Sequence, residues 1–158
     1  IAKSFGTEVT GVCSTRNLEM LRSIGADYVI DYTKEDFIKS DKRYDLIITM
    51  VGYRSIFDYK RILSSTGIYV AVGGSMGQIF QPMIIGPWIT KKEGKKFYSL
   101  THKVNQQDLY YMKELLETGK IKPVIDKTYT LSDVPEAFKY YEKGHTQGKI
   151  AISIKQNK

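Results

Sequence analysis

The feature that most constrains the fold of this chain is a regular alternation of short β-rich runs with helical patterns. Four runs rich in apolar and β-branched residues lie at 8–13, 28–30, 45–51 and 68–73, and amphipathic stretches separate them. Neighbouring parallel strands need a crossover of a dozen or more residues, usually a helix, so the alternation predicts a parallel sheet covered by helices. The run at 45–51 is almost continuously apolar, which predicts a strand buried on both faces.

The pattern loosens between residues 74 and 96, where glycines and prolines interrupt any long helix. We therefore predict loops and short helical pieces for this stretch. An edge strand is expected at 96–100. Asn105 then begins a helix, with Asp108 three residues later as its capping-box partner.

The C-terminal part of the chain follows a different pattern. A short strand is predicted at 128–131, a helix that Ser132 caps comes next, and a last strand is predicted at 149–154. A proline after the preceding long helix marks the change. We therefore expect a boundary between two packing units near this proline.

The net charge of +7 fits two explanations. One is an anionic partner, such as nucleic acid or a phosphorylated cofactor. The other is an ordinary solvated surface, because the lysines are scattered along the chain. Their dense cluster at 91–96 has no interleaved series of aromatic residues on which bases would stack, so we expect no nucleic-acid partner. No apolar run reaches the roughly 20 residues that span a bilayer, so no membrane partner is expected either.

A single cysteine, Cys13, excludes an internal disulfide and suits a cytoplasmic location. His102 and His145 lie far apart in the sequence without a cluster of zinc-type ligands, so we expect no metal site. His145 is predicted to be a loop residue at a helix end, where the helix dipole favours it. Cys13 is predicted to be a small core residue, because no histidine lies beside it to activate the thiol. No catalytic acid or base is identified.

A dinucleotide-binding fold usually shows a glycine-rich turn after its first strand, where backbone N–H groups hold the pyrophosphate. No G-x-G-x-x-G turn occurs in this chain. Residues 1–5 instead fit the tail of a helix that leads through Gly6 into a strand. We therefore expect a doubly wound sheet that lacks its first strand and its glycine turn.

The end of the strand at 8–13 carries a signal about the cofactor. An NAD-specific site usually places Asp or Glu there, which binds the ribose hydroxyls and repels a 2′-phosphate. This chain has Ser14, Thr15 and Arg16 and no acid. Hydroxyls donate to phosphate and a guanidinium supplies forked, charge-assisted donors, so the pattern predicts NADPH. The alternative is that Ser14 and Thr15 merely cap the helix that begins near Asn17.

Five segments resemble the zinc-free, quinone-oxidoreductase-like branch of the medium-chain dehydrogenase/reductase family, and they occur in that family's order. They are GVCSTRN at 11–17, IGADYVIDY at 24–32, GKIKPVID at 119–126, PEAF at 135–138 and GHTQGK at 144–149. The resemblance implies a Rossmann-like nucleotide-binding domain over 1–124 and a segment of a GroES-like catalytic domain over 125–158. For the parent enzyme it implies hydride transfer from NADPH to a quinone, an enone or a related carbonyl compound. It also implies a homodimer joined through the edge strand at 96–100, and we expect the fragment alone to be inactive.

The same resemblance implies cofactor contacts for eight residues, and Thr15 joins them from the pattern at the strand end. The eight are Ser14, Arg16 and Tyr32 around the adenosine 2′-phosphate, Val51 and Gly52 on the adenosine side, Gly73 and Gly74 near the nicotinamide ribose, and Asn105 near the nicotinamide. Simpler explanations stay open for three of these residues: Tyr32 covers the sheet edge, Gly73 forms a turn, and Asn105 caps a helix. The chain departs from the family's pattern at Tyr53, which adds bulk at the expected adenosine site.

Two rival hypotheses come from other classes of protein. In one, the chain is a truncated, catalytically inactive domain that dimerises or binds a nucleotide. In the other, it is a methyltransferase-like α/β domain that binds S-adenosylmethionine. Such a domain favours an early glycine loop and an acid near Ser14, and the sequence has neither.

Overall fold

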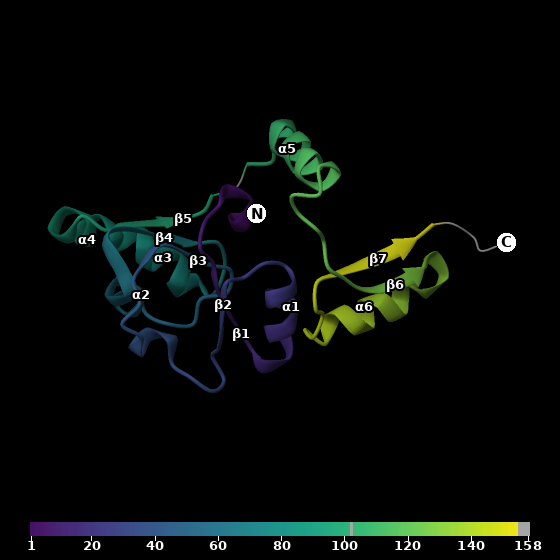
Figure 1. Ribbon diagram of the computed structural model, residues 1–158, viewed down its shortest axis with the longest axis horizontal. Coiled ribbons are helices and arrows are strands. Elements are labelled where there is room, and N and C mark those ends of the chain that lie inside the picture. Colours follow the sequence, from purple (N-terminus) through teal and green to yellow (C-terminus); the bar gives the residue numbers. More distant parts are fainter. Residues whose placement is uncertain (102, 155–158) are drawn as a thin grey trace. The chain divides into compact units, whose positions relative to one another are not determined.

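The computed structural model describes residues 1–101 and 103–154 (Figure 1). Its strands are β1 (Thr10–Cys13), β2 (Tyr28–Asp31), β3 (Tyr44–Thr49), β4 (Leu63–Ala71), β5 (Lys96–Ser99), β6 (Ile125–Thr130) and β7 (Lys149–Ser153). Its α-helices are α1 (Leu18–Ser23), α2 (Ile56–Ile62), α3 (Met76–Ile84), α4 (Gly86–Glu93), α5 (Gln106–Glu117) and α6 (Val134–Glu142). Short 3₁₀ helices are η1 (Ala2–Phe5), η2 (Thr15–Asn17), η3 (Phe37–Lys39) and η4 (Leu131–Asp133).

All strand pairs described in this structure are parallel. β1 pairs with β2, β4 lies between β3 and β5, and β6 pairs with β7. A helix crosses over between the strands of each pair: α1 follows β1, α2 follows β3, α3 and α4 follow β4, and α6 follows β6. The predicted α/β architecture with parallel sheets is therefore confirmed.

Contacts divide the chain into two compact units. One consists of Ile1–Glu35 with Asn105–Lys158, and the other of Asp36–Val104. The first unit holds the β1–β2 and β6–β7 sheets, and the second holds the β3–β4–β5 sheet. The expected domain boundary after residue 124 stays a prediction, and β6 begins directly after it.

The core of the unit Asp36–Val104 is built on a series of stacked aromatic rings. The ring centroids of Phe37 and Tyr59 lie 6.4 Å apart, those of Tyr59 and Tyr69 4.8 Å, and those of Tyr69 and Phe97 5.6 Å. All four side chains are buried. Rings at these separations add a favourable interaction beyond the area that they bury. The series joins η3, α2, β4 and β5 into one core.

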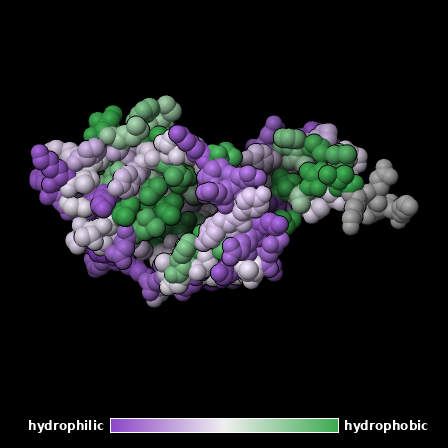
Figure 2. Space-filling model, turned by 90° about the horizontal axis from the view of Figure 1, so that it is seen from above, coloured by the Kyte–Doolittle hydropathy of each residue, from purple (hydrophilic) through white to green (hydrophobic). Residues whose placement is uncertain are grey.

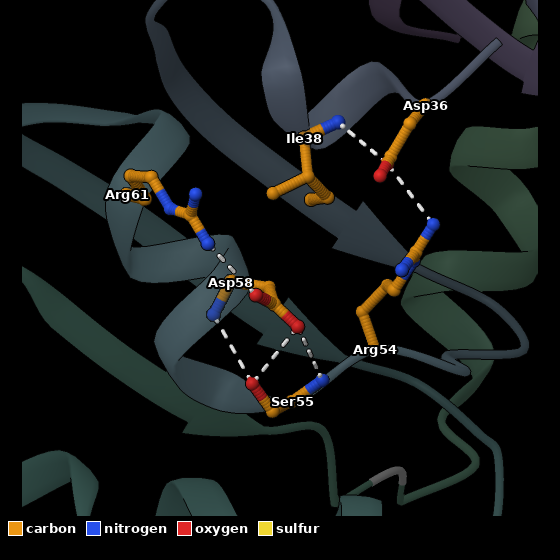
Figure 3. A network of polar contacts seen from close by, with 6 residues as sticks. All are labelled: Asp36, Ile38, Arg54, Ser55, Asp58 and Arg61. Carbon is orange, nitrogen blue, oxygen red and sulfur yellow. Dashed lines mark hydrogen bonds and ion pairs between the residues drawn. The ribbon is translucent and has the colours of Figure 1, made fainter.

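The start of α2 is fixed by a reciprocal cap (Figure 3). The Ser55 hydroxyl oxygen accepts from the Asp58 backbone N–H at 3.2 Å, and the Asp58 carboxylate accepts from the Ser55 backbone N–H at 3.3 Å. Arg61, one turn later, donates to the same carboxylate at 3.1 Å. This capping box satisfies backbone donors that a helix start otherwise leaves without partners.

Loops and short helical pieces were predicted between 74 and 96, and the structure has the helical pieces, because α3 and α4 fill most of this stretch and leave little of it as loop. Pro82 lies inside α3, and Pro87 lies in the first turn of α4, where a missing N–H costs nothing. Gly86 serves packing instead of breaking a helix: a Cβ there would lie 2.9 Å from the Cβ of Phe97 in β5. Loops were expected here because glycine and proline often break helices, whereas in this chain they fit within or between helices.

Two other local predictions need correction. β3 is not buried on both faces, because Leu46 and Ile48 expose 53% and 54% of their surface. The crossover helices α2 and α3 contact β4, which is the better covered strand. Ser132 does not cap α6 either: it lies inside η4, and Asp133 holds the N-cap position without a side-chain hydrogen bond.

The C-terminal strand–helix–strand segment carries an apolar hollow. α6 and β7 line a hollow of about 370 Å³. Its apolar walls include Phe138 and Tyr141 from α6 and Ile152 from β7. Figure 2 shows apolar side chains gathered over this segment, at the right of the view.

Candidate functional site

The loop that follows β1 carries three of the predicted cofactor residues, and we call residues 14–17 the recognition loop. Ser14 is extended, with φ −79° and ψ 159°, at the N-cap position of η2, and its side chain makes no capping hydrogen bond. The alternative in which Ser14 merely caps a helix is therefore not what the structure shows. Arg16 lies two residues further along and is exposed. A hydroxyl and a guanidinium are thus presented together at the carboxyl end of a parallel strand.

Thr15 is committed to a different partner. Its hydroxyl donates to the carboxylate of Asp31, the last residue of β2, in a short hydrogen bond. Thr33 donates to the same carboxylate from its backbone N–H at 3.0 Å and from its hydroxyl at 2.6 Å. The hydrogen bond from Thr15, then those from Thr33, hold the pKa of Asp31 below its usual range. Thr15 therefore anchors the recognition loop, and its contact with a cofactor stays a prediction.

Asp31 is a site residue that the sequence analysis missed. It is only 5% exposed and lies opposite Cys13 in the parallel register of β1 and β2. The signal was available in principle, because the carboxyl ends of adjacent parallel strands meet at one edge of a sheet. Its carboxylate accepts hydrogen bonds from Thr15 and Thr33 and has little contact with solvent.

Tyr32 and Cys13 complete the surroundings of the recognition loop. The Tyr32 backbone N–H donates to the Cys13 carbonyl at 3.1 Å, and the Tyr32 side chain is 46% exposed. Burial, together with the nearby Asp31 carboxylate, raises the pKa of the Cys13 thiol, and Arg22 opposes this only in part. The thiol therefore stays protonated at neutral pH, as suits a packing residue.

The other unit brings four predicted residues together where β3 and β4 end. Gly52 and Gly74 form a parallel bridge, and a Cβ at Gly73 would lie 2.6 Å from the Met50 carbonyl oxygen. Gly74 has φ +125°, a conformation that side chains rarely adopt. Val51, which precedes Gly52 after the end of β3, is 79% exposed. The two backbones thus approach each other closely here.

Tyr53 is held by its neighbours within this unit. Its ring meets Phe37 edge to face, with centroids 6.2 Å apart, and the Arg54 guanidinium lies 5.4 Å from its centroid. Arg54 in turn donates to Asp36 at 3.0 Å, and Asp36 also accepts from the Ile38 backbone N–H (Figure 3). The bulk that set Tyr53 apart from the family's pattern is therefore packed against η3.

Asn105 is the N-cap of α5. Its side-chain oxygen accepts from the Asp108 backbone N–H at 2.8 Å, and its side-chain nitrogen donates to the Asp108 carboxylate at 2.7 Å. Capping accounts for both ends of the amide. A contact between Asn105 and a nicotinamide stays a prediction.

Comparison with known sequences defines the family. A sequence profile of zinc-binding dehydrogenases matches residues 24–152. The chain therefore belongs to the zinc-binding dehydrogenase family, as a quinone-oxidoreductase-like member of the medium-chain dehydrogenases/reductases. The resemblance inferred from the sequence is thus confirmed.

Individual relatives agree with this assignment. The mouse mitochondrial NAD(P)H oxidoreductase RTN4IP1 is 32% identical over 98% of this chain and 43% of its own length. The chloroplastic quinone-oxidoreductase QR1 of Triphysaria versicolor is 30% identical over 96% of this chain and 46% of its own length. The chain thus spans less than half the length of these relatives. Since their names place them in organelles, a cytoplasmic location for this chain stays a prediction.

Solved structures show the same Rossmann-type fold. The quinone oxidoreductase of Coxiella burnetii superposes with a TM-score of 0.74 and 27% identity, over 98% of this chain and 47% of that one. A putative alcohol dehydrogenase from Sinorhizobium meliloti gives a TM-score of 0.77 at 19% identity, over 96% of this chain and 42% of that one. At that identity the second likeness concerns the fold alone.

The family's name raises the question of zinc. Within 1–101 and 103–154, no three His, Cys, Asp or Glu side chains are placed to hold a metal ion, while His102 lies outside the described residues. The donor set on these residues does not fit zinc, and no step is assigned to a metal. Likewise, no helix in the described part of the chain is long and apolar enough to cross a membrane.

Proposed function

We propose that the protein containing this chain transfers hydride from NADPH to a quinone, an enone or a related carbonyl compound. The recognition loop is the observation that carries the proposal, because it presents Ser14 and Arg16 without an acid between them. A bound nicotinamide supplies the hydride, while this chain's residues hold and orient the adenosine half of the cofactor.

The buried state of Asp31 supports a preference for the phosphorylated cofactor. An acid that meets the ribose hydroxyls disfavours a 2′-phosphate through like-charge repulsion. Here the carboxylate of Asp31 is satisfied by Thr15 and Thr33, whereas Arg16 is exposed. Arg16 therefore gives the recognition loop an exposed positive charge, which is what a 2′-phosphate requires of its partner.

The glycine residues where β3 and β4 end suit the cofactor's other half. A side chain at Gly73 would collide with the Met50 carbonyl, and Gly74 has a left-handed backbone. Glycine is therefore required at both positions by the backbone itself, where the ends of the two strands lie close together. We propose that Val51 and Gly52 line the adenosine side and that Gly73 and Gly74 lie near the nicotinamide ribose.

Replacing Arg16 with alanine tests the preference for NADPH. In the full reading frame that contains these residues, we expect Arg16→Ala to weaken NADPH by about 1.5–3 kcal/mol, the usual worth of a hydrogen bond to a charged group. The affinity for NADH should change little. Titrations followed by nicotinamide fluorescence measure both dissociation constants.

The matched control is Arg22→Ala, which removes another exposed arginine of the same unit. Arg22 is paired with Glu19 on α1, so its guanidinium already has a charged partner. This variant should change both affinities slightly and equally. Equal weakening of NADPH and NADH by Arg16→Ala would show that the residue does not read the 2′-phosphate.

We further propose that the 158 residues are inactive on their own. Among the described strands, β1 pairs only with β2. More than half of the length of each of these relatives lies outside the part that this chain matches.

The edge of β5 supports a homodimer. β5 pairs only with β4 among the described strands, and Tyr98 on it is 52% exposed. Because an unpaired apolar edge invites pairing with another chain, we expect light scattering to give a dimer mass for the full reading frame. Tyr98→Lys should shift the mass toward the monomer, whereas Tyr110→Lys on α5 should leave it unchanged. A monomer at high concentration before any substitution would contradict the dimer.

A further inference from the structure

We propose that Gln147 is a positioning residue, which holds the recognition loop in the shape that binds the 2′-phosphate. The inference rests on the proposed function, since it assigns a remote residue to that same site. Gln147 lies between α6 and β7, in the C-terminal segment. It is separated from the recognition loop by more than a hundred residues.

Both donors of the Gln147 carboxamide are directed at the recognition loop. The side-chain nitrogen donates to the Arg16 carbonyl oxygen at 2.7 Å and to the Asn17 side-chain oxygen at 3.0 Å. A primary amide has two N–H groups, and each has an acceptor here. One side chain therefore fixes the backbone at Arg16 and the side chain at Asn17 together.

Gln147 is itself held by contacts that do not involve its side chain. Its backbone N–H donates to the Asp126 carboxylate at 3.0 Å, and the Tyr140 hydroxyl donates to the same oxygen at 2.9 Å. The residue that follows, Gly148, has φ +115° and leaves no room for a Cβ beside the Val124 carbonyl. The carboxamide is thus aimed from a constrained backbone, so a substitution at Gln147 removes the side-chain contacts without removing the anchor.

The contact with Asn17 has a consequence for Ser14. Because the Asn17 oxygen accepts from Gln147, its nitrogen faces the Ser14 hydroxyl oxygen, at a long distance of 3.5 Å. A hydroxyl that accepts in this way keeps its own hydrogen for another acceptor. The Ser14 hydroxyl is therefore able to donate, which is the role that an anionic 2′-phosphate requires.

The recognition loop is consequently tied from two sides. On one side Thr15 is bonded to Asp31 at the end of β2, and on the other Gln147 holds Arg16 and Asn17. The Arg16 side chain between these ties is exposed. A loop that is already ordered loses less conformational freedom on binding. These hydrogen bonds therefore favour NADPH, the cofactor that makes more contacts with the loop.

Gln147→Met tests the proposal, because methionine keeps the length and shape of the side chain but has no N–H. In the full reading frame we expect the dissociation constant of NADPH to rise about 5- to 30-fold, the effect of losing one to two hydrogen bonds. That of NADH should change less than about threefold. Backbone amide hydrogens of residues 15–18 should exchange faster, with or without cofactor. The control Gln107→Met removes an exposed glutamine of α5 and should alter none of these quantities.

The outcomes separate this proposal from the proposed function. Equal weakening of both cofactors, or no change in amide exchange at residues 15–18, would overturn the positioning role. If the unsubstituted protein does not prefer NADPH, the proposed function is wrong. The amide-exchange result alone then tests whether Gln147 holds the recognition loop. Faster exchange in Gln147→Met but not in Gln107→Met would still support Gln147 as the residue that holds the loop.

Discussion

Replacing Tyr69 with alanine is expected to lower the free energy of unfolding by about 3–5 kcal/mol, as large aromatic deletions in cores do. Tyr69 is 2% exposed, and its ring lies between those of Tyr59 and Phe97. The alanine variant loses both ring contacts and leaves a cavity at the centre of the aromatic series. Urea unfolding followed by the fluorescence of Trp88, the single tryptophan of the chain, measures the change.

The conservative variant Tyr69→Phe separates packing from hydrogen bonding. It keeps the ring and loses only the contact of the hydroxyl with Thr49, at 2.9 Å. We expect a cost of about 0.5–1.5 kcal/mol for that change. Similar costs for the two variants would mean that the stacked rings contribute little to stability.

The second large effect is expected at alkaline pH. Burial, with a further contribution from Tyr69, raises the pKa of Tyr59 to about 12. The folded protein therefore keeps this proton at pH values where the unfolded chain, with an ordinary pKa near 10, has lost it. The stabilising contribution is complete below pH 10 and is lost as the pH rises from 10 to 12. The loss amounts to about 2–3 kcal/mol, since one pKa unit corresponds to about 1.4 kcal/mol.

Stability measured between pH 8 and pH 12 tests this linkage. Other groups titrate in the same window, so the informative quantity is the difference between variants. Tyr59→Phe has no proton to lose and should show a flatter decline with pH than the unsubstituted chain. Tyr110→Phe changes an exposed tyrosine of α5 and should leave the profile as it was. Parallel profiles for all three proteins would contradict the expectation.

Short-range sequence patterns predicted the helices and strands. The features that were not predicted depend on contacts between residues far apart in the sequence. The alternation of strands and helices was readable because side-chain periodicity and capping residues such as Asn105 act over a few residues. Gly86 and Pro82 misled because their roles depend on contacts with distant elements. The candidate site divides in the same way. The Ser14 and Arg16 pair is local, whereas Gln147 meets the recognition loop only through the fold.

The junction between α2 and β4 has a consequence for motion. α2 ends at Ile62 and β4 begins at Leu63, with no linker between them, and both side chains are 2% exposed. A hinge needs residues that can change their backbone angles without disturbing packed side chains. None is available here, because turning the helix would pull Leu63 out of the core. The exposed Ser65 and Thr66 come only after that anchor, so the helix and the first residue of the strand move as one rigid body.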